Sequence, residues 1–139
     1  MARLLMQRGA LFMARNNAQA SLAPYSQSLS IRTQKLRADH PSVASSQLAL
    51  GKALLATGEL ERAGPLIQGA LNQRASTLAQ NHPDVISATT ALAEWANAKG
   101  NTEQAATLAQ RVLDNPPKEP TEDSRKDLQK VREMLAATP

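Results

Sequence analysis

The residues best suited to chemistry in this sequence are its two histidines, which occur in closely similar surroundings. His40 lies in RADHPSVAS and His82 lies in AQNHPDVIS, so each begins a His-Pro-x-Val segment. Two imidazoles that meet in space can bind a metal ion or act as general bases. A repeated turn would produce the same pattern, because Asp39 or Asn81 can hydrogen bond to the local backbone and proline restricts the entry to a helix.

The spacing of the two histidines favours the repeated turn. They are 42 residues apart, and many other residues match at the same offset. A period of this length is typical of repeat proteins, and the matches extend upstream into a third, incomplete copy that begins the chain. The matching pairs are Pro41 with Pro83, Val43 with Val85, Leu50 with Leu92, Gly58 with Gly100, Ala63 with Ala105, Leu66 with Leu108, Tyr25 with Ile67, Leu29 with Leu71 and Arg32 with Arg74.

Each copy predicts two helices. A proline at position 41 or 83 suits the first helical turn, and the pattern from Val43 to about Thr57 has helical spacing. Gly58 and its counterpart Gly100 favour the end of a helix and a reversal of the chain. A second helix is expected from about Leu60 to Leu78. Its inner side is predicted to carry Ala63, Leu66, Ile67, Ala70 and Leu71.

Composition agrees with an all-α fold and narrows the chemistry. The chain has no cysteine and only one each of Trp, Tyr and Phe, so closely packed helices of Ala and Leu are favoured. Thiol chemistry and disulfides are excluded, and the six glycines are scattered singly rather than forming a phosphate-binding loop. Equivalent histidines in adjacent copies would lie roughly 10 Å apart. We therefore expect no enzyme, and no catalytic, metal-binding or cofactor-binding residues.

The segment LALGKALLATGELERAGPLIQGAL resembles a tetratricopeptide repeat, and the run into His-Pro-x-Val is similar to the 42-residue variant of kinesin light chains. The resemblance implies a right-handed α-solenoid of antiparallel helix pairs that serves as a non-enzymatic adaptor or scaffold. The expected divisions are a partial first repeat at 1–38, a second repeat at 39–80, a third at 81–114, a proline-rich linker at 115–120 and a C-terminal capping helix at 121–139.

The capping helix is predicted from residues alone. The segment DNPPKEP ends the preceding helix, and Thr121 can cap a new one with Glu122 and Asp123 in its first turn. A single apolar stripe then faces the solenoid, as a terminal cap requires. It consists of Leu128, Val131, Met134 and Leu135.

The family resemblance implies that a peptide or helix of a partner protein lies in a concave groove lined by the first helices. The predicted groove is apolar in the first two copies and polar in the third. Carried over residue by residue, its lining is Met6, Ala10 and Met13, then Ser45, Leu48, Lys52, Leu55 and Ala56, then Ser87, Thr90, Glu94, Asn97 and Ala98.

The N-terminus leaves two alternatives open. No acidic residue precedes Asp39, which is typical of organelle transit peptides, but residues 1–15 keep the register of the later first helices. We therefore expect a structural helix and a cytoplasmic protein, with an organellar location as the alternative. A structural subunit or fragment, with this apolar helix buried against a partner or self-associating, is the second functional hypothesis. A basic module that binds nucleic acid is a less favoured third, and no membrane span is expected.

Overall fold

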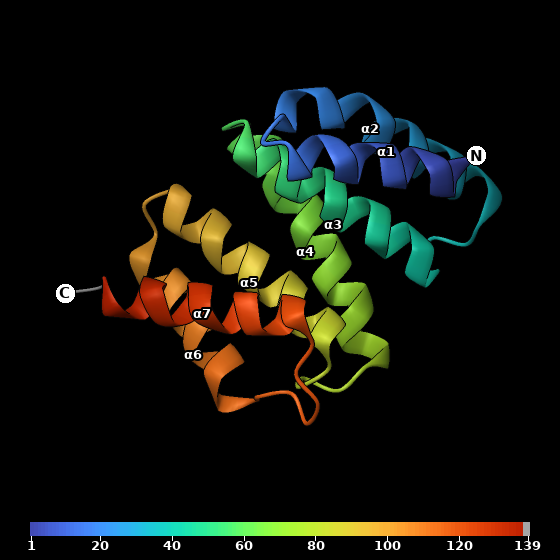
Figure 1. Cartoon of the computed structure of the whole chain (residues 1–139). Coiled ribbons are helices and arrows are strands. Elements are labelled where there is room, and N and C mark those ends of the chain that lie inside the picture. Colours follow the sequence, from blue (N-terminus) through green and yellow to red (C-terminus); the bar gives the residue numbers. More distant parts are fainter. Residues whose placement is uncertain (138–139) are drawn as a thin grey trace. The chain divides into compact units, whose positions relative to one another are not determined.

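The computed structural model describes residues 1–137, and within them the chain forms seven α-helices and no strand. This confirms the all-α prediction. The chain divides into two compact units, residues 1–73 and the remainder from Arg74 onward, and each is described by itself. The helices are α1 (Ala2–Ala14), α2 (Ala18–Lys35), α3 (Pro41–Ala56), α4 (Leu60–Thr77), α5 (Pro83–Ala98), α6 (Thr102–Asp114) and α7 (Glu122–Ala136) (Figure 1).

The two histidines begin α3 and α5 as N-caps. Nδ1 of His40 accepts a hydrogen bond from the backbone N–H of Ser42, and Nδ1 of His82 accepts one from Asp84, both at 3.0 Å. The turn prediction is right in kind, but the capping side chain is the histidine and not the preceding Asp39 or Asn81. The carboxylate of Asp84 lies 3.9 Å from Nδ1 of His82.

Gly58 and Gly100 end the first helices of their pairs as predicted. Both have a φ of +84°. An L-residue rarely adopts this left-handed conformation, which glycine enters without a steric cost. The same turn therefore leads into α4 and α6.

Close approach of the two helices within a pair is achieved by a small residue facing a larger one. A Cβ atom on Gly9 would lie 2.5 Å from the ring of Tyr25, and one on Gly51 would lie 2.7 Å from Cγ1 of Ile67. The third copy has alanine at both positions equivalent to Gly51 and Ile67, so each copy fills the same space differently. Burial in this contact also raises the pKa of the Tyr25 hydroxyl.

In the first two copies, an arginine near the end of the second helix donates a hydrogen bond to the next first helix. Nη1 of Arg32 donates to the carbonyl of Ser42 at 2.9 Å, and Nη1 of Arg74 donates to the carbonyl of Asp84 at the same distance. Burial lowers the pKa of the Arg74 guanidinium, and the charge of Asp84 acts in the opposite direction. In the third copy this position is Pro116, so the connection to α7 is made differently.

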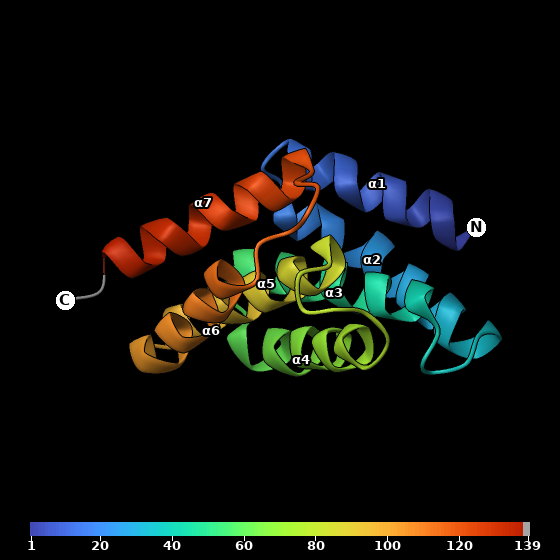
Figure 2. The ribbon, with the colours of Figure 1, turned by 90° about the horizontal axis from the view of Figure 1, so that it is seen from below.

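Helix α7 completes the second unit by packing against α5 and α6 (Figure 2). Thr121 caps it as predicted, in a reciprocal pair of hydrogen bonds with Ser124. Residues 138 and 139 of the predicted capping segment lie outside the described residues. The buried cluster that joins α7 to the unit is Ile86, Ala109, Val112, Leu128 and Val131, with Leu113, Met134 and Leu135 packed against it.

Candidate partner-binding surface

The predicted groove positions on α1 are open to solvent to different degrees. Ala10 is exposed, while Met6 and Met13 are half-buried. Met6 also joins α1 to α3, because its sulfur lies 3.5 Å from Oγ of Ser46. The two methionines therefore combine packing within the unit with a surface that a ligand can reach. Their unbranched side chains adapt to partners of varied shape.

On α3 most of the predicted positions are accessible. Lys52 and Leu55 are half-buried, as is Ser45, and Ala56 is exposed. Leu48 is the exception, since only 5% of its surface is exposed. This corrects the prediction for Leu48, which belongs to the core and not to a surface that a partner contacts.

A buried polar cluster stabilises this part of the first unit. Oγ of Ser28 on α2 lies 3.1 Å from Oγ of Ser46 on α3, and Arg32 donates to the same Ser46 hydroxyl at 3.0 Å. Both serines are fully buried. Hydrogen bonds of this kind hold α2 and α3 in one register, so that the accessible face of α3 is held in place.

In the second unit the predicted positions separate into buried and accessible ones. Thr90 is 1% exposed, and its hydroxyl has no hydrogen-bond partner among the described residues. Thr90 is therefore also removed from the surface that a partner can contact. Ser87 is half-buried on the same helix.

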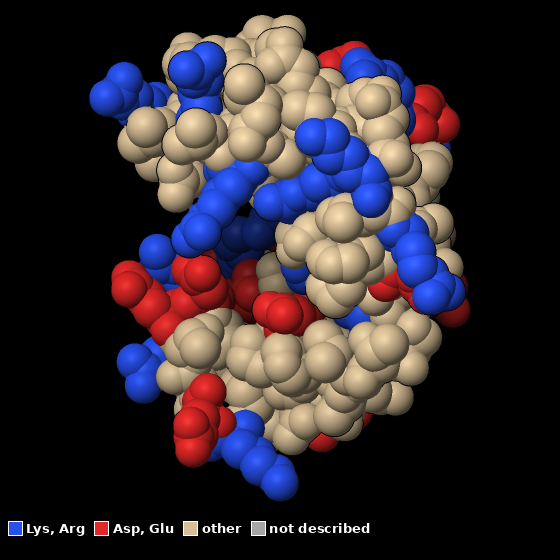
Figure 3. Space-filling model, turned by 90° about the vertical axis from the view of Figure 1, so that its right-hand side faces the viewer, with Lys and Arg blue, Asp and Glu red and all other residues tan. Residues whose placement is uncertain are grey.

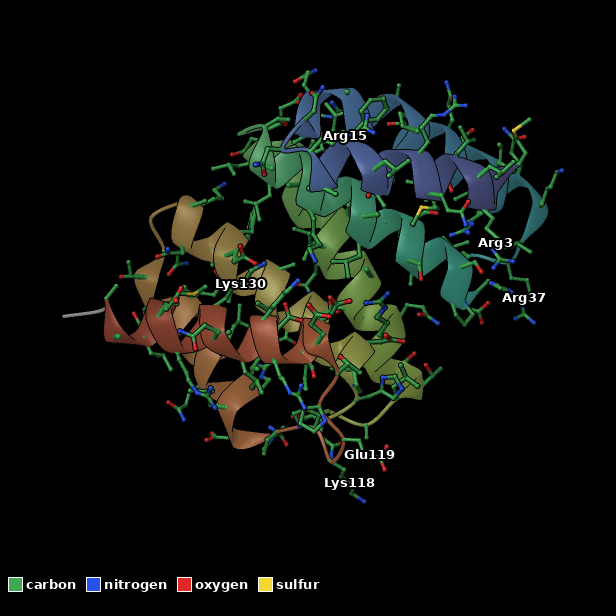
Figure 4. All side chains as sticks on the ribbon, viewed as in Figure 1. Arg3, Arg15, Arg37, Lys118, Glu119 and Lys130 are labelled. Carbon is green, nitrogen blue, oxygen red and sulfur yellow. The ribbon has the colours of Figure 1, made fainter. Side chains whose placement is uncertain are left out.

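The remaining third-copy positions line a hollow together with α7. Its volume is about 420 Å³. Nζ of Lys130 on α7 lies 3.7 Å from Oε1 of Glu94 on α5. The Lys130 side chain thus extends from α7 toward α5 (Figure 4). The lining from α5 is Glu94, Asn97 and Ala98, and the lining from α7 and its C-cap is Lys130, Glu133, Met134 and Ala137.

The contribution of α7 to this hollow is not predicted by the sequence, which indicates only a capping helix here. The available signal was the position of Met134 at the edge of the apolar stripe, followed by Ala137 one turn later. Because α7 packs against both α5 and α6, it contacts the third pair as the first helix of a further repeat would. The surface of the second unit is therefore continued by α7 rather than closed by it.

The two units differ strongly in charge. Residues 1–73 contain eight Lys and Arg against three Asp and Glu, a net charge of +5, whereas the remainder contains eight against nine, a net charge of −1. Lys and Arg side chains protrude from the face of the molecule that Figure 3 shows. Arg3 and Arg37 lie toward one end of this unit and Arg15 lies at the other end of α1 (Figure 4).

The described residues contain no group of three or more His, Asp or Glu side chains that could hold a metal ion. His40 and His82 each use Nδ1 in a helix cap. Among the described helices, none is long and apolar enough to cross a bilayer.

Comparison with known proteins agrees with this architecture. Residues 50–118 match the tetratricopeptide repeat family. Crystal structures of the nearly identical TPR-like repeats of a candidate kinesin light chain from Podosopora anserina, and of a single-substitution variant of it, superpose with TM-scores of 0.76 and 0.75. Both are 22% identical in sequence, with 96% of this chain and 71% of that chain covered. A search of curated proteins finds no match.

The chain is thus an all-α protein of helix-pair repeats with the fold of TPR-like solenoids. Its residues 50–118 belong to the tetratricopeptide repeat family, and its fold is similar to that of the kinesin-light-chain TPR-like repeats.

Proposed function

We propose that this chain is a non-enzymatic adaptor that holds a peptide or helix of a partner protein against the first helices of its repeats. The observation that carries the proposal is the accessible strip left on these helices. Ala10, Ala56 and Ala98 are exposed, one on each first helix, at predicted groove positions. Tetratricopeptide repeats are protein-interaction modules in general, which supports a protein as the ligand.

The chemistry of the strip indicates what the partner offers in each unit. In the first unit half-buried Met6, Met13 and Leu55 favour an apolar ligand surface, and Lys52 adds a positive charge beside them. In the second unit the hollow between α5 and α7 combines Glu94, Lys130 and Glu133 with Met134. The first unit therefore suits an apolar segment of a ligand, and the second unit suits a polar segment.

The three exposed alanines provide a matched test. The partner is first isolated with the full chain, and its affinity is then measured for Ala10→Glu, Ala56→Glu and Ala98→Glu separately. Each substitution places a charged side chain in the contact, so each should weaken binding by about tenfold or more. Circular dichroism should be unchanged, since all three positions are exposed on helices.

Ala75→Glu is the control for these variants, because Ala75 is also an exposed alanine but lies on α4, a second helix. It should bind the partner like the wild type. Equal binding by all four variants would contradict the groove proposal. Leu48 is unsuitable for such a test, because a carboxylate at this buried position would be expected to unfold the first unit.

A further inference from the structure

A second accessible surface lies on another side of α1. Met1, Leu4 and Leu11 are 82%, 65% and 58% exposed, and they are the large hydrophobic side chains that stand out to solvent among the described residues. Arg8 and Arg15 are exposed between and beyond them. Positions 1, 4, 8, 11 and 15 follow a three-four spacing, which keeps them on one side of a helix. We call these five residues the Leu/Arg stripe.

The repeat register shows what this side of a first helix does elsewhere in the chain. Forty-two residues later, the first four positions of the stripe are taken by residues of α3, which packs against α2. All four are 5% exposed or less. The stripe is therefore the counterpart of a helix-packing face, but no described helix covers it. The buried counterparts are Val43, Ser46, Leu50 and Ala53.

An open cavity beside the stripe supports the same interpretation. It has a volume of about 340 Å³ between α1 and α2, with Met1, Leu5 and Ile31 in its lining. The counterpart of Ile31 in the second copy is Gln73, whose Nε2 donates to the carbonyl of Asp39 at 2.7 Å. In that copy the incoming chain segment thus lies against the equivalent place. In the first copy the cavity offers room for an apolar side chain of a ligand.

The two arginines determine the chemistry of the ligand. Arg8 stands where the second copy has Leu50, and the guanidinium groups of Arg8 and Arg15 make no hydrogen bond or ion pair with the described part of the chain. A purely apolar helix on the stripe would bury both guanidinium groups without a partner, which is strongly unfavourable. The arginines are seven positions apart, or about 10.5 Å along the helix, so two carboxylates two turns apart on a facing helix would match them.

A second copy of this chain fits the stripe poorly. The helix α1 contains no acidic residue. If two α1 helices paired in parallel, Arg8 of one would face Arg8 of the other. If they paired antiparallel with Leu4 against Leu11, the two Arg8 side chains would again lie close together. Like charges in such a contact oppose association. The ligand must therefore supply the negative charge itself.

We propose that the Leu/Arg stripe docks an amphipathic helix of a partner protein. The docked face carries apolar residues against Leu4 and Leu11 and carboxylates against Arg8 and Arg15. This surface is distinct from Met6, Ala10 and Met13 on the same helix, so the chain has two separate ligand surfaces.

A charge-exchange experiment tests this proposal with the full chain. The probes are two labelled helical peptides of about six turns. In the first peptide, one side of the helix carries leucine and glutamate in alternation, at positions three and four residues apart. The second peptide has lysine in place of each glutamate. Fluorescence anisotropy should show that the wild type binds the glutamate peptide at least about tenfold more tightly. Arg8→Glu combined with Arg15→Glu should reverse this preference. Leu4→Asp combined with Leu11→Asp should weaken the binding of both peptides at unchanged helicity.

The control is Arg3→Glu combined with Arg132→Glu, which changes the net charge equally but lies outside the stripe, on α1 and α7. It should keep the wild-type preference. Equal binding of the two peptides by the wild type, or a preference that Arg8→Glu with Arg15→Glu leaves unchanged, would overturn the proposal. So would binding to vesicles of phosphatidylcholine and phosphatidylserine without binding to either peptide, or a wild-type dimer that is lost when Leu4 and Leu11 are replaced.

Discussion

Two neighbouring threonines on α5 illustrate how differently the same side chain can be accommodated in the core. Thr89 and Thr90 are 3% and 1% exposed. The hydroxyl of Thr89 donates to the carbonyl of Val85 at 2.8 Å, whereas the hydroxyl of Thr90 has no partner among the described residues. A buried hydroxyl without a hydrogen bond loses its interaction with water and gains nothing in return.

The two positions therefore predict different effects on stability for the same isosteric substitution. Thr90→Val should raise the free energy of unfolding by about 1 kcal/mol, because it removes the unsatisfied group. Thr89→Val should not stabilise the protein, because it removes the hydrogen bond from the Thr89 hydroxyl to the carbonyl of Val85. Urea denaturation monitored by circular dichroism measures both. A Thr90→Val variant that is less stable than Thr89→Val would contradict this account of the α5 core.

At the scale of the element, the histidine caps are open to a direct test. His40→Ala and His82→Ala should each lower the free energy of unfolding by about 1 kcal/mol, since each leaves an N–H at the start of α3 or α5 without its acceptor. Asparagine is a strong N-cap residue, so His40→Asn and His82→Asn should restore the stability. Denaturant midpoints that are equal for the alanine and asparagine variants would show that the caps contribute nothing.

The contact between α3 and α4 makes a second prediction for elements. Gly51→Ala should destabilise the protein by about 1 kcal/mol or more, because its new Cβ would meet the fully buried Ile67. Ala93 and Ala109 occupy the equivalent positions in the third copy, and both are buried. Gly51→Ala should therefore cost less, or become favourable, when Ile67 is also replaced by alanine.

A double-mutant cycle on these two positions measures the effect. The coupling free energy should be about 1 kcal/mol in favour of the double variant. Strictly additive effects would mean that the glycine is not there to make room for Ile67.

The elements were largely predictable from the sequence, whereas the burial of individual positions on them was less so. The offset of 42 residues located the prolines, the turn glycines and the ends of α3 and α4 to within about two residues. Those features depend on local backbone chemistry. The burial of Leu48 and Thr90, by contrast, depends on which other helices pack over them. For the same reason the sequence does not predict that Lys130 and Met134 line the hollow beside α5, because the packing of α7 against α5 is a tertiary contact.

At the scale of the whole molecule, the chain combines a recurring type of helix-pair packing with surfaces that change from copy to copy. The same glycine turn and the same arginine contact recur, while the first unit is basic and the second slightly acidic. Equivalent packing positions in different copies carry different small residues, such as Gly51 in the second copy and Ala93 in the third. Exposed positions vary in charge and polarity, which is where specificity for a partner would reside.

The central claim, that partners bind along the first helices, is tested most directly by photo-crosslinking from defined positions. Benzoylphenylalanine would replace Ala10, Ala56 or Ala98 in turn, with the exposed Ala75 on α4 as the control. After irradiation in an extract of the source cells, crosslinked proteins are identified by mass spectrometry. The account predicts a common partner that is crosslinked from the three groove positions and not from position 75. Crosslinks that are the same from all four positions, or absent from the groove positions, would contradict it.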